Sequence, residues 1–205
     1  RYCPAVDAVI VHGANHHISR GKKQWTWGNH EFGYAWDRNL TEPDENGVCW
    51  PYIELMAGVY TDNQPDFSFL APGETKTFSQ YWYPIRKIGA AAAATLEAAI
   101  GLKLDGVRLT VGVQATERVA GARIIVSSSD GALANHEADL DPVKPILLAV
   151  DLPDGVDRDD IRVVVEQGGR VLVERRPVDR GERTIPPPAT EPPPPEEIES
   201  ADELW

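Results

Sequence analysis

Short runs of aliphatic and β-branched residues recur along the second half of the chain, and each ends at a turn sequence. These runs lie at 107–113, 122–126, 146–150 and 161–166, with Ser, Asp, Gly and Pro-Asp-Gly segments between them. Runs of this length bounded by such residues are typical of antiparallel strands. We therefore predict a small immunoglobulin-like β-sandwich over residues 102–178, and because it lacks convergent polar groups we interpret it as a structural module.

Strict alternation of polar and apolar residues indicates two further strands. Residues 52–60 place aliphatic side chains on one face and Tyr52, Glu54 and Tyr60 on the other. Residues 75–83 alternate in the same way, so we expect the two strands to form a hairpin with a long polar tip. Aromatic rings beside a carboxylate suit a surface that faces a sugar, which makes Glu54 the first candidate for chemistry.

The segments that join these parts have their own composition. Residues 88–94 are Ala-rich and helical by propensity, but flanking glycines and the lack of an apolar stripe favour a linker or crossover, and both readings stay open. We treat 89–101 as a connector between residues 1–88 and the sandwich. Seven of the 17 prolines fall within 186–195, which predicts an extended, semi-rigid spacer.

The sequence around and beyond the prolines is acidic. We assign residues 179–197 to a Pro-rich acidic linker. Ser200 and Glu203 then form a plausible capping box, which predicts that residues 198–205 begin a helical region. Because the chain begins at Arg1 in a strand-like pattern and stops at Trp205 within this stretch, we expect it to be a fragment of a longer protein.

Charge and composition exclude several classes of partner. The chain holds 20 Lys+Arg against 32 Asp+Glu, a formal net charge of −12, and it lacks the basic stripe that a phosphate backbone requires. No apolar run approaches the roughly 20 residues that span a bilayer, and no signal peptide is recognisable. We therefore expect a soluble protein with no nucleic-acid or membrane partner, and we favour the cytoplasm.

Cysteine spacing predicts no metal or redox chemistry. Cys3 and Cys49 are the only cysteines, and they form neither a Cys-x-x-Cys pair nor a Cys/His cluster with zinc spacing. A disulfide between them is an alternative to two separate thiols, and that choice stays open. We expect no metal and no cofactor.

The polar tip of the expected hairpin holds a second group of candidate residues. Two carboxylates and two amides fall within five positions, at Asp62, Asn63, Gln64 and Asp66. Together they have more hydrogen-bonding capacity than a turn needs, which suits binding of sugar hydroxyls. The alternative is that these side chains satisfy only the backbone of their own loop.

An aromatic and charged segment at 25–38 supplies the remaining candidates for substrate binding, which are Trp27, Glu31, Trp36, Asp37 and Arg38. Aromatic residues beside charges are the usual makeup of sugar subsites and also of ordinary hairpin cores, and Gly28 and Gly33 argue against a helix. Glu31 or Asp37 could pair with Glu54, as glycoside hydrolysis requires. The alternative for Asp37 and Arg38 is a structural salt bridge.

The ordered elements around Glu54 resemble a known family. Tyr52-Ile-Glu54, the Asp62-Asn-Gln-Pro-Asp-Phe67 loop and the Pro72-Gly-Glu-Thr75 turn are similar to the C-terminal signature of aldose 1-epimerases, the galactose-mutarotase-like proteins. The resemblance implies that Glu54 is the catalytic base and that the loop lies near the sugar cleft. It implies an all-β fold in which residues 1–88 are the C-terminal part of a β-supersandwich.

A closer resemblance extends over nearly the whole chain. The Thr26-Trp-Gly-Asn29, Trp36-Asp-Arg-Asn-Leu-Thr41 and Lys76-to-Pro84 segments resemble an uncharacterised bacterial domain family of the mutarotase-like superfamily. Its members commonly continue into a small β-domain, a proline-rich linker and tetratricopeptide repeats. This implies a sugar or glycan ligand and a protein partner bound through the repeats.

Mutarotases pair their glutamate with a histidine that protonates the ring oxygen, and that histidine lies upstream of the part matched here. His12, His16, His17 and His30 do not match it, so we expect this chain alone to be inactive. The sequence therefore predicts a carbohydrate-recognising domain acting at an anomeric carbon by acid/base chemistry, epimerase-like or glycosidase-like, with Glu54 as base. The alternative is a non-catalytic glycan-binding scaffold in which Trp27, Trp36 or Trp82 matters more than Glu54.

Overall fold

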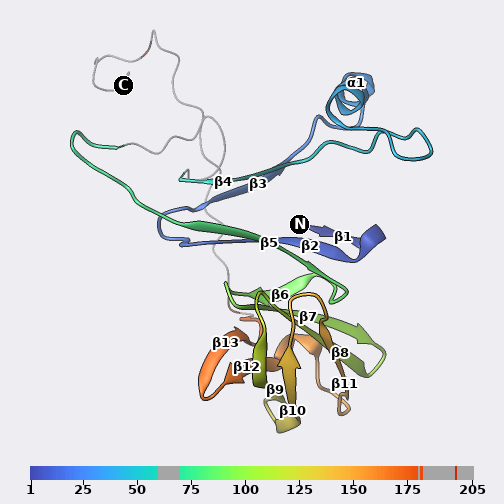
Figure 1. Cartoon of the computed structure of the whole chain (residues 1–205), viewed down its shortest axis with the longest axis vertical. Helices are drawn as coiled ribbons and strands as arrows, with labels where there is room; N and C mark the ends of the chain where they lie inside the picture. Colours follow the sequence, from blue (N-terminus) through green and yellow to red (C-terminus); the bar gives the residue numbers. More distant parts are fainter. Residues whose placement is uncertain (60–69, 180, 182–196, 198–205) are drawn as a thin grey trace. The chain divides into compact units, whose positions relative to one another are not determined.

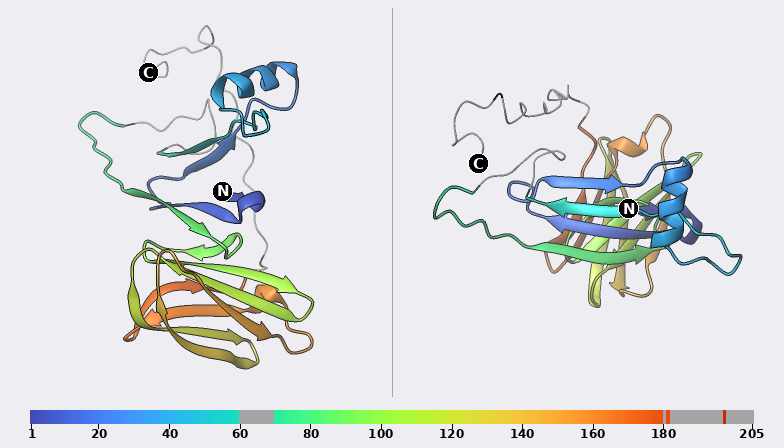
Figure 2. Two further views of the ribbon diagram at one scale, coloured as in Figure 1. Left: turned by 45° about the vertical axis from the view of Figure 1, so that its right-hand side comes forward. Right: turned by 90° about the horizontal axis from the view of Figure 1, so that it is seen from above.

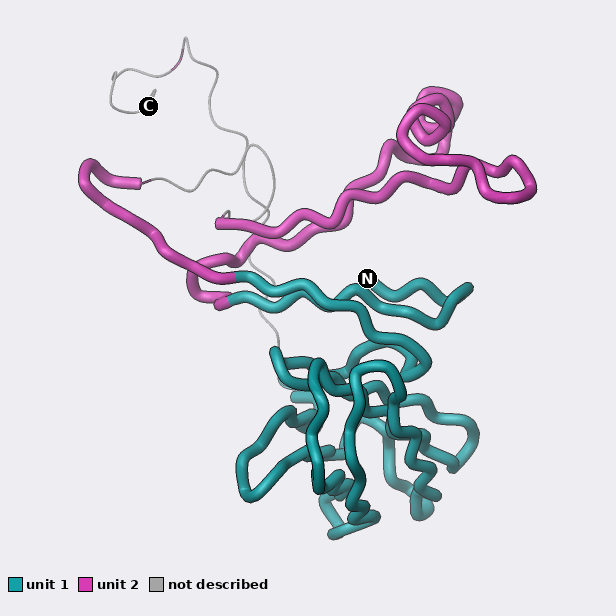
Figure 3. The backbone as a smooth tube through the Cα atoms, in the orientation of Figure 1, with its two compact units in different colours: residues 1–14, 80–183 teal, residues 15–79, 184–205 magenta. Residues whose placement is uncertain are grey.

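The computed structural model describes residues 1–59, 70–179, 181 and 197 (Figure 1). The chain divides into two compact units, one made of residues 1–14 and 80–183 and the other of residues 15–79 and 184–205 (Figure 3). The sequence suggested that residues 1–88 form one part that precedes the sandwich. In the structure, both ends of that part belong to the same unit as the sandwich.

The first unit contains a β-sandwich of two four-stranded sheets (Figure 1). One sheet has the order β11-β8-β7-β6 and consists of β6 (Ala91–Ala94), β7 (Ala98–Asp105), β8 (Arg108–Ala115) and β11 (Ile146–Asp151). The other has the order β10-β9-β12-β13 and consists of β9 (Val119–Ser128), β10 (Gly131–Leu140), β12 (Arg162–Gln167) and β13 (Arg170–Arg175). A 3-10 turn, η2 (Arg158–Asp160), precedes β12. All neighbouring strands are antiparallel, which confirms the prediction of an all-β sandwich.

The core of the sandwich is built from the aliphatic runs that the sequence pattern singled out. Val111 and Val113 of β8 face Ile124 of β9 and Val163 and Val165 of β12, and all five side chains are fully buried. Alternate residues of each run point into the space between the sheets because side chains alternate along a strand. Burial of each such side chain contributes about 1.5–3 kcal/mol relative to exposure.

The sandwich begins earlier than the sequence suggested. The segment 89–101, expected to be a connector, contains β6 and the first half of β7. Residues 91–94 pair with β7 although alanine favours helices. The reason is tertiary: Ala98, Ala99 and Ile100 are completely buried, and a strand at 91–94 extends the same sheet beside them.

A small sheet from both ends of the first 88 residues packs against the sandwich within the first unit. It has the order β1-β2-β5, from β1 (Tyr2–Cys3), β2 (Ala8–Ala14) and β5 (Gln80–Arg86), and a 3-10 turn, η1 (Pro4–Val6), joins the first two strands. Val9, Val11 and Ile85 share a second buried cluster with Ile88 and with Ala99 of β7. The expected boundary at residue 88 therefore runs through a packed core.

Ile88 packs against the sandwich at a place where two glycines leave the sheet surface without side chains. Gly101 and Gly112 are directly paired on β7 and β8. A Cβ atom on Gly101 would lie 1.8 Å from the Ile88 carbonyl oxygen, and one on Gly112 would lie 2.6 Å from the Ile88 Cβ. Only glycine permits this approach. Nearby, the Arg86 N–H donates to Gln114 Oε1 (2.9 Å), whose Nε2 donates to the Pro142 carbonyl (2.5 Å).

The second unit contains β3 (Gly21–Trp25), α1 (Glu31–Leu40) and β4 (Glu54–Gly58) (Figure 2). β3 and β4 form an antiparallel pair in which Trp25 lies opposite Glu54. β4 therefore pairs with β3 and β5 pairs with β2, so the expected hairpin between the 52–60 and 75–83 strands is wrong. Alternation identifies the faces of a strand but not its partner.

The helix α1 also corrects an expectation, because two glycines had argued against helical structure at 25–38. Gly28, at φ 83°, lies before the helix in the turn that leads into it. Gly33 is buried inside the helix, where a Cβ would lie 2.7 Å from the carbonyl oxygens of both Trp27 and Gly28. Gly33 therefore permits α1 to pack closely on that turn. Among the described residues no helix has the length and apolarity needed to cross a membrane.

Candidate functional site

Aromatic rings from β3, the following turn and α1 gather into one cluster in the second unit. Trp27 stacks on Trp36 with ring centroids 4.7 Å apart and an interplanar angle of 11°. Trp25 meets Trp27 edge-on at 4.6 Å, and Phe32 meets Trp27 and Trp36 edge-on at 6.0 and 6.3 Å. These are favoured geometries for aromatic pairs. The helix brings Phe32 and Trp36 together because they are four residues apart.

The cluster is only partly covered by protein. The rings of Trp25, Trp27 and Trp36 are half-buried, and Phe32 is 58% exposed. The Trp27 Nε1 atom is buried and has no hydrogen-bond partner among the described residues. An indole N–H normally finds a partner when it is buried. The cluster therefore has exposed ring surface and, at the buried Trp27 indole N–H, a hydrogen-bond donor without a described partner.

A carboxylate lies beside this cluster, held by a short chain of hydrogen bonds. Asp37 is 6% exposed and its Oδ1 accepts the Tyr52 backbone N–H at 3.0 Å. The Tyr52 hydroxyl donates to Glu54 Oε1 at 3.2 Å. Burial raises the pKa of Tyr52 above its ordinary value, and the hydrogen bond to Glu54 and the negative charge of Glu54 raise it further. The phenol is therefore protonated at neutral pH and orients one oxygen of the Glu54 carboxylate.

The structure brings together some of the predicted site residues. Trp27, Trp36, Asp37 and Glu54 belong to the assembly just described, in which Glu54 sits opposite Trp25. Glu31 lies exposed in the first turn of α1, where a negative charge favours the helix N-terminus, and it makes no hydrogen bond to Glu54.

The salt bridge given as the alternative for Asp37 and Arg38 is not formed, and the loop candidates are not described. No ion pair joins Asp37 to Arg38, because neighbouring helical residues point in different directions and Asp37 is occupied by Tyr52. The predicted loop residues Asp62, Asn63, Gln64 and Asp66 lie outside the described residues. The two thiols are free, Cys3 exposed and Cys49 half-buried.

A shallow hollow lies between α1 and the loop that follows it. Its volume is about 280 Å³, and it is lined by Tyr34, Asp37, Arg38, Gly47 and Cys49. Arg38 and Tyr34 are exposed there, and the Tyr34 hydroxyl donates to the Asn29 carbonyl at 3.1 Å. The hollow adds a cation and an aromatic ring to this side of the helix.

Two residues close to Glu54 in the chain were not predicted from the sequence to belong to the site. Tyr52, although recognised on the strand, was not singled out as the partner of Glu54, and Trp50 was not considered. Trp50 is 61% exposed, and its indole N–H donates to Asp44 Oδ2 at 3.1 Å. The Asp44-Glu-Asn-Gly47 sequence is a recognisable turn signature that could have drawn attention to this loop.

The described histidines make contacts of other kinds. His12 Nε2 lies 3.1 Å from Gln80 Oε1, and its ring lies 4.4 Å from that of Trp82, both within the first unit. The rings of His16 and His17 lie 3.9 Å apart, centroid to centroid, and are tilted by 40°. None of the described histidines bonds to Glu54, and the described residues contain no group of three or more His, Cys, Asp or Glu side chains that could hold a metal ion.

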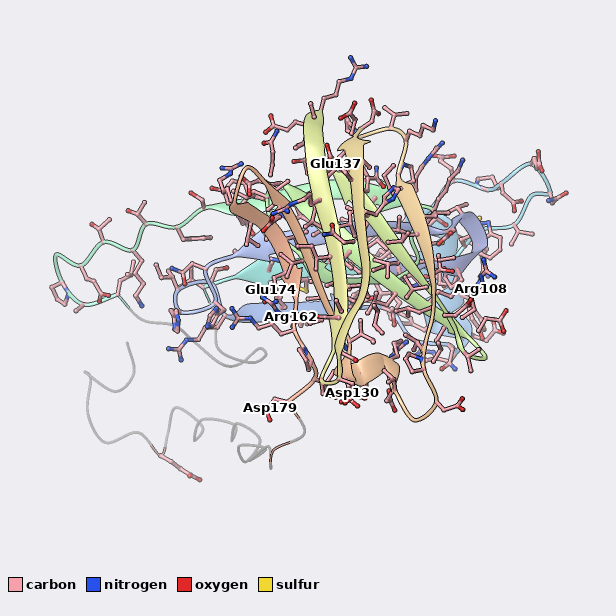
Figure 4. All side chains as sticks on the ribbon, turned by 90° about the horizontal axis from the view of Figure 1, so that it is seen from below. Arg108, Asp130, Glu137, Arg162, Glu174 and Asp179 are labelled. Carbon is pink, nitrogen blue, oxygen red and sulfur yellow. The ribbon has the colours of Figure 1, made fainter. Side chains whose placement is uncertain are left out.

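The first unit offers a different surface chemistry. A hollow of about 270 Å³ is lined by strand ends of β2, β5 and β6 and includes Tyr81, Tyr83 and Thr95. The Tyr83 hydroxyl donates to the Thr95 carbonyl at 2.5 Å, and burial raises its pKa to about 12. On the sandwich, charged side chains pair with each other, as Arg162 and Glu174 do at 2.6 Å (Figure 4).

Comparison with known proteins finds a similarity for part of the first unit. Residues 93–174 match a family described as YphG-like protein, second domain. The matched range covers β7 to β12, the last two of the four residues of β6 and five of the six residues of β13, so it corresponds to the sandwich. No solved structure was found to match the chain.

Proposed function

We propose that residues 15–59 carry a carbohydrate-recognising site that belongs to a mutarotase-like domain. The observation that carries this proposal is the half-covered Trp25–Trp27–Phe32–Trp36 cluster beside the Asp37–Tyr52–Glu54 hydrogen-bond chain. Aromatic rings bind the C–H faces of sugars, and a positioned carboxylate accepts a hydroxyl proton. The resemblance of the Glu54 strand to aldose 1-epimerases points to the same ligand.

Glu54 is the proposed base at the anomeric carbon. It would accept the proton of the anomeric hydroxyl while an acid from another part of the protein protonates the ring oxygen, which breaks the bond between the anomeric carbon and the ring oxygen. The Tyr52 hydroxyl would hold Glu54 in place by its hydrogen bond. A glycosidase-like role would need a second carboxylate, and Asp37 is already bonded to the Tyr52 N–H.

A second candidate function is a non-catalytic glycan-binding scaffold. The observation that favours it is the exposed part of the aromatic cluster, which can bind a sugar by stacking without any catalytic base. In this case the chain would bind sugar through its aromatic cluster and recruit a protein partner through helical repeats beyond the spacer. The match to a second domain fits an order in which the sandwich follows another domain.

The test compares the full-length parent protein with its Glu54→Gln variant by saturation-transfer NMR against mono- and oligosaccharides. Glutamine keeps the shape of the side chain but cannot act as a base, so an enzyme loses at least about 100-fold in turnover while binding is nearly unchanged. Glu117→Gln, the same change at an exposed site on the sandwich, is the matched control.

The outcomes separate the two functions. Turnover lost only in the Glu54 variant establishes an enzyme. Binding by all three proteins with unchanged sugar signals establishes the scaffold. Absence of any sugar signal transfer contradicts both.

A further inference from the structure

We infer that Trp50 is a second, outer saccharide platform, which makes the site prefer neutral oligosaccharides over monosaccharides. This inference rests on the proposed carbohydrate function and deepens it. Trp50 lies in the loop between α1 and β4, four residues before Glu54, and 61% of its surface is exposed.

The loop holds the Trp50 ring in a fixed orientation. The indole N–H donates to Asp44 Oδ2 at 3.1 Å. The other carboxylate oxygen of Asp44 accepts the backbone N–H groups of Asn46 at 2.8 Å and Val48 at 2.9 Å. Both oxygens are therefore used, one by the turn and one by the indole. A ring whose orientation is fixed before binding loses little conformational entropy when a ligand stacks on it.

The base of the loop is tied to the helix that supports the aromatic cluster. The Thr41 hydroxyl donates to the Asp37 carbonyl at 2.8 Å and lies 3.0 Å from the Trp50 carbonyl, and Pro43 and Cys49 form a β-bridge. Trp50 and Glu54 are four residues apart, so their Cα atoms are separated by no more than about 14 Å. A ligand on Trp50 is thus within reach of the Glu54 site along one glycan chain.

The surroundings of Trp50 favour a neutral sugar over a protein or an acidic sugar. Residues 42–47 are mostly polar and include the exposed carboxylates Glu42 and Glu45, against one exposed cation, Arg38, in the adjoining hollow. Val48 is the other large exposed apolar side chain in the loop. A stable protein interface buries roughly 800 Å² per partner, far more apolar surface than these two side chains provide. Clustered carboxylates repel the carboxylates of acidic sugars but accept hydrogen bonds from hydroxyl groups.

The experiment measures binding of glucose, galactose, maltohexaose, cellohexaose and polygalacturonate to the full-length parent by calorimetry. We expect a neutral hexasaccharide to bind about tenfold tighter than its monosaccharide, an increment in the range of one aromatic contact. Trp50→Ala should remove that gain and leave monosaccharide affinity unchanged. Asp44→Asn keeps the Trp50 ring but replaces one of the two accepting carboxylate oxygens by an NH₂ group, so one side of the hydrogen-bond pattern is lost. This variant should lose part of the gain in hexasaccharide affinity.

Val48→Ala, an exposed apolar change in the same loop, is the matched control and should bind like the parent. Equal affinity for hexasaccharides in the parent and in Trp50→Ala overturns the inference while monosaccharide binding still supports the carbohydrate function. A concentration-dependent self-association that Trp50→Ala abolishes, with sugar binding intact, also overturns it in favour of a protein interface. Failure of the parent to bind any sugar overturns both.

Discussion

Asp44 shows how one carboxylate organises a whole loop. Its two oxygens accept the N–H groups of Asn46 and Val48 and the indole N–H of Trp50, and the Asp44 N–H donates to the Val48 carbonyl at 3.0 Å. The hydrogen bond from Val48, followed by those from Asn46 and Trp50, lowers the pKa of Asp44. These bonds favour the charged form of the side chain.

The lowered pKa of Asp44 gives a pH prediction. A carboxyl group whose pKa is depressed on folding stabilises the structure fully above its unfolded pKa, near 3.9, and loses that contribution as the pH falls through the folded value. We expect the NMR signal of the Trp50 indole N–H to be constant above about pH 5 and to shift below about pH 4. In Asp44→Asn this titration should be absent; a parent signal that does not move with pH would contradict the role of Asp44.

At the scale of elements, the close contact between α1 and the preceding turn shapes the aromatic cluster. Gly33 lets the helix approach the carbonyl oxygens of Trp27 and Gly28, and Trp36, one turn further along the helix, stacks on Trp27. The helix position and the ring stack therefore depend on the same glycine. The close packing of the α1 backbone on the preceding turn therefore supports the proposed binding surface.

Gly33→Ala tests that link. Alanine stabilises a helix by about 1 kcal/mol relative to glycine, but the added Cβ meets two backbone oxygens at 2.7 Å, which cannot yield as a flexible side chain would. We expect a net loss of about 1–2 kcal/mol and a weaker near-ultraviolet circular dichroism band from the Trp pair. Gly13→Ala, where a Cβ has open space, is the matched control and should be neutral or slightly stabilising. A more stable Gly33→Ala variant with an unchanged band would refute the packing argument.

At the scale of the whole molecule, the sandwich and the β1-β2-β5 sheet act as one unit. Ile88 is 5% exposed and packs into the space left by Gly101 and Gly112, and Val9, Val11 and Ile85 complete the cluster over Ala99. The range matched by the second-domain family, 93–174, contains Ala99 and both glycines but not Ile88. We therefore expect the sandwich to depend on residues outside the matched range.

Ile88→Ala measures this dependence. Truncating a buried isoleucine should cost about 2–5 kcal/mol in the free energy of unfolding, and in one cooperative unit the loss reaches every strand. Native-state hydrogen exchange should show equal loss of protection in β2 and β8. Leu147→Ala, at a β11 position that is 57% exposed, is the control and should change protection little. Loss confined to β2 and β5 would show that the small sheet folds as a separate unit.

The all-β architecture and the candidate ligand class could be argued from local patterns. Alternating runs such as 107–113 and 161–166 identify strands because burial of every second side chain is a property of a few neighbouring residues. The concentration of Trp at 25–36 likewise indicates a group of aromatic side chains from the local sequence alone. Glu54 was placed on a strand for the same local reason.

Contacts between distant residues were decided by the tertiary structure. The pairing of β4 with β3 and of β5 with β2, the helix at 31–40 and the strand at 91–94 all contradict or refine local expectations. Propensity and alternation describe only a short window, whereas a strand's partner and a glycine's close approach depend on residues far away in the chain. The Tyr52–Glu54 bond and the Ile88 contact with Gly101 and Gly112 exist because the folded backbone brings those particular atoms together.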